Sequence, residues 1–90
     1  MDKKDVLNVS VVWHYFSGFA DYEIKATAIS SENKTGKFDI LPGHANFICV
    51  IYNNLVLYTP EKKKRIYAFE KGIVQVSENN VKLFLEGKID

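Results

Sequence analysis

Apolar and polar side chains alternate along much of the chain, and this pattern predicts β-strands. Between Leu7 and Phe16 every odd-numbered position is apolar, whereas Asn8, Ser10 and His14 occupy even-numbered positions. A period of two is typical of a strand with one buried face. Similar patterns predict further strands at residues 22–28, 37–40, 55–58, 65–69, 73–76 and 81–85. No window of about eleven residues shows a period of 3.6, so we expect no substantial helix.

Turn-forming residues separate the predicted strands. Asn53-Asn54 is expected to form a tight type I′ hairpin because Asn tolerates positive φ. The polar stretch from Ser30 to Gly36 is expected to be an exposed loop. Other turns are expected at Ser17-Gly18, Pro42-Gly43, Lys71-Gly72 and Glu78-Asn79-Asn80. Short strands with turns every eight to twelve residues or so predict a flattened all-β sandwich or barrel of about eight to ten mostly antiparallel strands.

One apolar run does not alternate. Residues 47–52 are all apolar, which indicates a strand covered on both faces or one that lines an interface. We therefore expect some of Phe47, Tyr52, Tyr58 and Tyr67 to lie in a subunit interface, since large apolar patches mark such surfaces. The interdigitated core is expected to include Trp13, Ile24, Phe38, Val50, Ile66 and Leu83.

Composition narrows the class of protein. Ninety residues provide one domain, spanning 1–90 with a core at about 6–86. Twenty Val, Ile and Thr residues against twelve Ala, Leu and Met favour strands over helices. Twelve Lys and Arg nearly balance eleven Asp and Glu, so no global field attracts nucleic acid or anionic membrane. The sequence has a single Cys, no long apolar span and no secretion signal, and these features indicate a cytosolic protein.

Candidate chemistry is sparse. Cys49 lies within the apolar run, where a thiol is normally buried and inert, with a raised pKa. His14 is expected to be exposed on a strand face. One Cys and two distant His residues provide no metal-ligand spacing, and the five glycines form no phosphate-binding loop. We therefore expect no catalytic residues, metal, cofactor or small-molecule substrate.

The run Lys62-Lys63-Lys64-Arg65 is the one local charge cluster in the sequence. With Tyr58, Tyr67 and Phe69 nearby, it is compatible with a barrel that binds single-stranded nucleic acid. A solvated turn, or lysines that guard a strand edge, would have the same sequence. The near-neutral net charge favours these simpler readings.

A more specific signal is the segment from Gly36 to Ala45, which reads GKFDILPGHA. Its Gly36, Phe38, Ile40, Leu41, Pro42, Gly43, His44 and Ala45 resemble the G-x-F-G-I-L-P-G-H-A segment of the epsilon subunit of rotary F-type ATP synthases. That segment belongs to the N-terminal β-sandwich domain. Elements resembling the opening strand, the F-x-G-x-A element and the closing strands follow in the family's order, from about Leu7 to Glu86.

The resemblance implies a function. It implies a non-catalytic central-stalk component that links the gamma subunit to the membrane rotor ring and couples proton transport to ATP synthesis. The residues that it and the apolar run suggest for the gamma interface are His44, Ala45, Phe47 and Tyr52. The residues that it suggests for the loop facing the ring are Glu32, Asn33, Lys34 and Lys37. The implied location is cytoplasmic, peripheral to the inner face of the cell membrane, within the synthase complex.

The chain also departs from the family pattern. Asp39 stands where Gly is common, and Gln75 replaces a usual Glu. The ninety residues contain no counterpart of the usual C-terminal helical hairpin, whether as a natural short form or as a fragment of a longer subunit. The resemblance therefore implies the coupling role but does not extend to inhibition of hydrolysis or to nucleotide sensing. Two alternatives stay open: a stand-alone epsilon-like sandwich that binds another protein, and a nucleic-acid-binding barrel centred on Lys62–Arg65.

Overall fold

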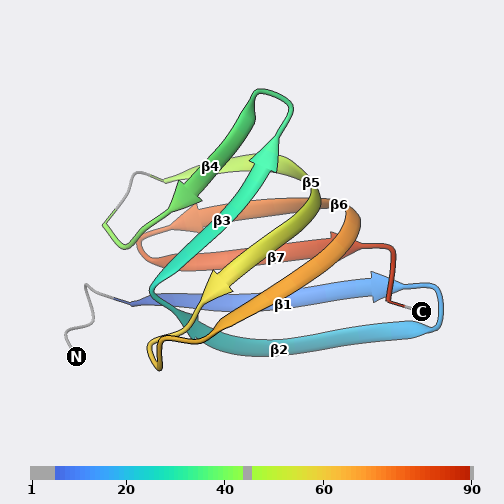
Figure 1. Cartoon of the computed structure of the whole chain (residues 1–90), viewed down its shortest axis with the longest axis horizontal. Helices are drawn as coiled ribbons and strands as arrows, with labels where there is room; N and C mark the ends of the chain where they lie inside the picture. The colour runs from blue at the N-terminus through green and yellow to red at the C-terminus, as the bar shows by residue number, and fades with distance from the viewer. Residues whose placement is uncertain (1–5, 44–45, 90) are drawn as a thin grey trace.

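The computed structural model describes residues 6–43 and 46–89, and these form an all-β fold (Figure 1). The strands are β1 (Leu7–Tyr15), β2 (Gly18–Ala26), β3 (Ala28–Asn33), β4 (Gly36–Ile40), β5 (Phe47–Tyr58), β6 (Lys64–Ser77) and β7 (Asn80–Glu86). They form one sheet in the order β2-β1-β7-β6-β5-β3-β4. Only β1 and β7 pair in parallel, which confirms the mostly antiparallel fold. The described residues contain no helix, and hence none that is long and apolar enough to cross a membrane.

This single sheet folds over itself into two layers. One layer, in front in Figure 1, contains β4, β3, the second half of β5 and the first half of β6. The other contains the first half of β5, the second half of β6, and then β7, β1 and β2. The Cα trace measures 38 × 28 × 19 Å, and its thin dimension suits two sheets stacked about 10 Å apart.

The number of strands is seven rather than the expected eight to ten, because β5 and β6 each join two predicted strands. The predicted hairpin at Asn53-Asn54 is wrong. Asn53 instead forms a bulge, at which the register of β5 against β6 shifts between Tyr52 and Asn54. Its φ of 73° is a conformation that Asn tolerates better than most residues. A bulge bends a strand and increases its twist, so β5 passes from one layer to the other.

The predicted turn at Lys71-Gly72 is also wrong, since both residues lie inside β6. Gly72 pairs with Ile51 on one side and with Leu85 on the other. A Cβ at this position would lie 2.8 Å from Leu85 Cδ2 and 2.9 Å from the backbone oxygen of Phe84. Glycine is therefore required here by the close approach of neighbouring strands rather than by a turn.

The expected loop from Ser30 to Gly36 is mostly strand. β3 continues to Asn33, and only Lys34 and Thr35 form the turn before β4 begins at Gly36. The polar composition of this segment misled the prediction, because both strands of an exposed hairpin can carry polar side chains. The predicted turns at Pro42-Gly43 and Glu78-Asn79 are confirmed. Glu78 and Asn79 have φ values of 48° and 66°, as a type I′ turn requires.

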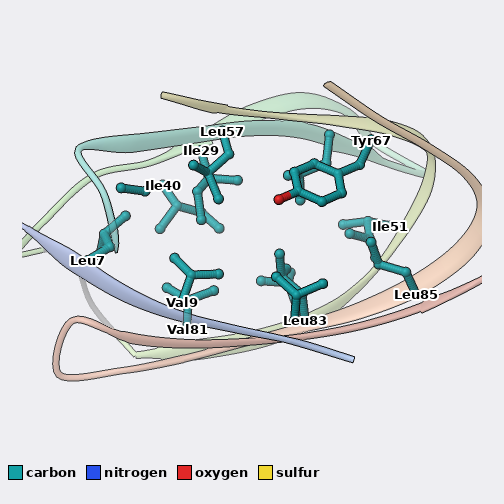
Figure 2. Packing of buried hydrophobic residues seen from close by; sticks show 14 of the residues in the cluster. Leu7, Val9, Ile29, Ile40, Ile51, Leu57, Tyr67, Val81, Leu83 and Leu85 are labelled. Atoms are coloured by element: carbon teal, nitrogen blue, oxygen red, sulfur yellow. The ribbon is translucent and has the colours of Figure 1, made fainter. Parts of the chain in front are cut away.

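The core lies between the two layers. Figure 2 shows Val9 and Leu83 facing Ile29 and Leu57 from the opposite layer. The buried apolar side chains are Leu7, Val9, Val11, Trp13, Ala26, Ile29, Ile40, Ile51, Leu55, Leu57, Tyr67, Phe69, Val74, Val76, Val81, Leu83 and Leu85. Trp13 and Leu83 were expected in this set, and the expected Ile24 and Phe38 pack against it half-buried.

Two predicted core residues are instead on the surface. Val50 is 36% exposed and Ile66 is 68% exposed. Each lies one position from a buried neighbour on its own strand, Ile51 and Tyr67, so the alternation of the strand directs it outward. The prediction failed because it considered apolar character without position along the strand.

Three hydrogen bonds join distant parts of the fold. The Tyr22 hydroxyl of β2 donates to the Tyr67 hydroxyl of β6 at 2.6 Å, which links the two layers. Trp13 Nε1 donates to the Gly87 carbonyl oxygen at 3.0 Å, and the Gly87 amide donates to the His14 carbonyl oxygen at 2.8 Å. The two bonds made by Gly87 hold the segment after β7 against β1.

Candidate interaction surfaces

The outer side of the second layer carries an apolar surface that we call the outer apolar face. Val50 of β5, Ile73 of β6, Phe84 of β7 and Val12 of β1 occupy one row across the sheet. Phe84 is 44% and Ile73 is 41% exposed, while Val12 is half-buried. Ile48 adds a 64% exposed side chain two positions before Val50. Adjacent exposed apolar side chains of this kind mark an interaction surface.

A shallow depression of about 410 Å³ lies within this face. Val12, Ile73 and Phe84 supply its apolar lining, while Lys71 and Glu86 contribute charged side chains to it. Apolar surface surrounded by polar groups is the usual arrangement of a protein–protein interface.

Sequence reasoning found only part of this face. The continuous run at residues 47–52 was identified, but it alternates between core and solvent instead of being covered on both faces. Ile73 and Phe84 were missed, although Phe84 stands between the buried Leu83 and Leu85, and Ile73 directly precedes the buried Val74. Where only one side of a sheet is buried, alternation directs at least one of three consecutive apolar side chains toward solvent. Runs of this kind can be found in the sequence.

The predicted gamma-interface residues have different environments. His44 and Ala45 lie outside the described residues. Phe47 points toward the core side and packs edge-on against Phe38, with ring centroids 6.2 Å apart. Tyr52 is half-buried and opposite Lys71 in the row beside the outer apolar face. The structure thus brings Tyr52 next to that face, but not Phe47.

The two other tyrosines of the interface prediction also differ. Tyr58 is 38% exposed in the front layer and pairs with Lys64. Tyr67 is buried in the core, where its ring lies 5.5 Å from that of Trp13. Burial is the main cause that raises the pKa of Tyr67, and the hydrogen bond with Tyr22 raises it further. Tyr67 is therefore a core residue with no surface available to a partner.

The predicted ring-facing residues form a polar hairpin where β3 ends and β4 begins. Glu32 and Lys37 are opposite each other, and Lys34 is exposed in the turn. Asn33 Oδ1 accepts hydrogen bonds from the Thr35 amide at 2.9 Å and the Thr35 hydroxyl at 2.7 Å. These bonds hold the turn in one conformation, and Figure 1 shows the hairpin projecting from the body of the sandwich.

The motif segment begins in the second strand of this hairpin and continues past β4. Ile40 is buried and Phe38 packs against the core, as expected, while Leu41 is exposed. Gly43 has a φ of 85°, and its amide donates to Asn79 Oδ1 at 2.8 Å. This hydrogen bond connects the turn after β4 to the turn between β6 and β7. The motif segment therefore determines the direction in which the chain leaves β4.

The two candidate reactive side chains, Cys49 and His14, lie on different strands, β5 and β1. Cys49 packs half-buried against the core, and burial raises the pKa of its thiol. His14 is exposed, as expected, with its ring 5.8 Å from that of Phe19. Among residues 6–43 and 46–89, no group of three or more His, Cys, Asp or Glu side chains is arranged to hold a metal ion.

Comparison with protein families gives one match over almost the whole chain. The sequence model described as "ATP synthase, Delta/Epsilon chain, beta-sandwich domain" matches residues 7–88. This finding confirms the resemblance that the segment from Gly36 to Ala45 carries.

Individual relatives agree with this match. The curated "ATP synthase epsilon chain 2" of Paraburkholderia xenovorans (strain LB400) is 37% identical over 54 residues, which are 59% of this chain and 39% of that protein. A chain in the cryo-EM structure of Euglena gracilis mitochondrial ATP synthase, OSCP/F1/c-ring in rotational state 1, matches with a TM-score of 0.72. That match has 18% identity, shows a shared fold, and covers 87% of this chain and 50% of the other. The matches thus span half or less of each relative.

Proposed function

Because this chain belongs to the family of ATP synthase delta/epsilon chain β-sandwich domains, we propose that it is a non-catalytic central-stalk component of a rotary ATP synthase. In this role it links the gamma subunit to the membrane rotor ring, so that proton transport stays coupled to ATP synthesis. It lies on the cytoplasmic side, at the periphery of the membrane, through its place in the complex.

The outer apolar face is the observation that carries this proposal. Ile48, Ile73 and Phe84 expose side chains that gain free energy when a partner covers them, about 25 cal/mol per Å² of apolar surface removed from water. The face is built on paired strands, so it needs little reordering on binding. We assign this face, together with Tyr52, His44 and Ala45, to the gamma subunit. Phe47 supports the interface from inside by packing against Phe38.

The polar hairpin is assigned to the rotor ring. Glu32, Lys34 and Lys37 present both signs of charge on a turn that is fixed by Asn33. A polar, charged tip suits contact with polar loops at a membrane surface better than contact with an apolar partner. The sandwich between the two surfaces has a continuous core, which transmits torque because packed interiors resist deformation.

Co-expression with the gamma and ring subunits of the same organism tests the proposal. We expect the chain to co-purify with gamma and, in the assembled complex, with the ring. Recovery of the chain free of both subunits would contradict the synthase role and favour a stand-alone sandwich that binds another protein.

A further inference from the structure

The basic run that the proposed function leaves unexplained lies on a well-defined turn between β5 and β6. The Thr59 hydroxyl accepts a hydrogen bond from the Lys63 amide at 3.1 Å and donates to the Lys63 carbonyl oxygen at 3.2 Å. The Lys62 amide donates to the Thr59 carbonyl oxygen at 3.0 Å, and Lys62 has a φ of 65°. Lys62, Lys63, Lys64 and Arg65 are all exposed. The four cations are therefore presented from one ordered backbone.

The strand that follows this turn has a free edge. Residues 64–68 of β6 pair with β5, whereas β7 pairs only with residues 71–77 of β6. Among the described residues, no second strand pairs with the first half of β6. Figure 1 shows this half, drawn in orange, as the outermost strand of the front layer.

The hydrogen-bond alternation identifies which backbone groups face outward. The Thr59 amide donates to the Lys63 carbonyl oxygen at 2.8 Å, so these two residues are a hydrogen-bonded pair. Partners in an antiparallel ladder alternate between bonded and non-bonded pairs. Arg65 therefore bonds to β5, and the N–H and C=O groups of Lys64 and Ile66 face the free edge.

The side chains along this edge have a distinct order. Four cations lie at its start, the 68% exposed Ile66 and the exposed Ala68 follow, and Glu70 lies at its end. Free ladder groups give affinity for an added strand, and alternate side chains give specificity. The order favours a ligand that is acidic at one end and apolar in the middle. Two acidic residues lie near the cations: the exposed Glu61 in the turn itself, and Asp39 of β4, which already accepts a 2.6 Å hydrogen bond from Ser30.

We propose that the free edge of β6 from Lys64 to Glu70 binds an extended, acidic segment of a partner protein as an added antiparallel strand. The acidic end of that segment lies beside Lys62–Arg65, and its apolar residues lie beside Ile66. This site is separate from the outer apolar face, which is on the other layer of the sandwich, and it does not depend on the proposed function. Lysines that only guard the edge against aggregation would bind no such segment.

Fluorescence anisotropy with the full chain tests this site. The probe is a labelled peptide of sequence Lys-Thr-Val-Thr-Val-Glu-Val-Glu-Glu, and the matched control peptide replaces each Val by Pro, which keeps apolar residues but removes the ladder donors opposite Ile66 and Ala68. We expect saturable binding of the first peptide and none of the second. Replacing all four cations, Lys62 to Arg65, by Gln should weaken binding about tenfold and flatten its dependence on salt.

A backbone variant separates strand addition from charge attraction. Ile66→Pro removes one outward N–H group, and Pro is tolerated on edge strands. Ile66→Thr keeps that group and a β-branched side chain, so it serves as the control. We expect binding to be lost in Ile66→Pro and to persist in Ile66→Thr. If Ile66→Pro does not fold, the tenfold weaker binding of the Gln variant and the absence of binding by the Pro-containing peptide carry the test. The proposal is overturned if neither peptide binds, if both bind equally, or if oligo(dT) of similar length binds more tightly than the peptide.

Discussion

Gly72 is the residue at which a missing side chain matters most. The position where its Cβ would lie is occupied by Leu85 Cδ2, Phe84 O and Ile51 Cγ1, all within 3.3 Å. Two of these atoms belong to side chains in the buried core, and the third belongs to backbone. A single glycine thus allows the second half of β6 to lie closely between β5 and β7, beneath the outer apolar face.

Gly72→Ala should therefore destabilise the fold by about 2 kcal/mol, within the range for overpacked interiors. Urea denaturation measures this change as a lower midpoint. Gln75→Ala, an exposed position on the same strand, should change stability by less than about 0.5 kcal/mol. Equal stability of the two variants would show that the core adjusts around Gly72 without strain.

Tyr67 is the second residue with a defined energetic role. Its hydroxyl accepts the hydrogen bond from Tyr22 inside the sandwich. We expect Tyr67→Phe to cost about 1 kcal/mol in the free energy of unfolding, because this bond is lost. Denaturation at neutral pH measures that loss. A Tyr67→Phe variant with unchanged stability would mean that Tyr22 bonds equally well to water.

The same residue predicts a dependence on pH. Burial raises the pKa of Tyr67 in the folded chain, so its contribution to stability is complete below the unfolded pKa of about 10. Above that pH the unfolded phenol ionises first, and the contribution is lost as the pH rises toward the folded pKa. Stability should fall more steeply between about pH 9 and 11 in the parent chain than in Tyr67→Phe. Parallel curves would contradict this assignment.

At the scale of elements, the two long strands β5 and β6 determine the shape of the molecule. Each belongs to both layers, and the bend in β5 occurs where Asn53 forms the bulge. The alternating pattern located most strands, since alternation depends on burial of one face and is local in sequence, but it missed β3, whose polar residues were expected to form a loop. It did not show that Asn53 and Gly72 lie inside strands, because positive φ and glycine serve turns, bulges and close contacts equally.

The bulge gives a prediction at this scale. Asn53→Gly should change stability by only a few tenths of a kcal/mol, because glycine adopts positive φ readily. Asn53→Val should cost about 1–2 kcal/mol, because a β-branched residue at a φ of 73° is strained. Thermal unfolding of the two variants compares these costs. A Val variant as stable as the Gly variant would mean that the bulge can be moved or removed freely.

At the scale of the whole molecule, two surfaces at different places define the proposed role. The outer apolar face could be predicted only in part, because which side of a strand faces solvent depends on which strands pair with it. The polar hairpin was located by resemblance, since a charged turn by itself indicates only solvation. The motif segment was more informative because Phe38, Ile40 and Gly43 each meet a specific structural requirement.

The polar hairpin gives a prediction for coupling. If the hairpin contacts the ring as proposed, reversing the charges of Lys34 and Lys37 to Glu should reduce ATP-driven proton pumping in the assembled complex severalfold, while ATP hydrolysis continues. Fluorescence quenching in membrane vesicles measures the pumping. Lys25→Glu, on β2 away from the hairpin, is the control. Unchanged pumping in the Lys34 and Lys37 variant would remove the hairpin from the ring contact.

The affinity of the chain for the gamma subunit tests the central claim most directly. Isothermal titration should compare the parent chain with Ile73→Lys, Phe84→Lys and Ile66→Lys, which all place a charge on an exposed apolar position. If the outer apolar face binds gamma, Ile73→Lys and Phe84→Lys each raise Kd at least about tenfold, or roughly 1.4 kcal/mol, and Ile66→Lys leaves it unchanged. Equal Kd values for all four chains would contradict the account.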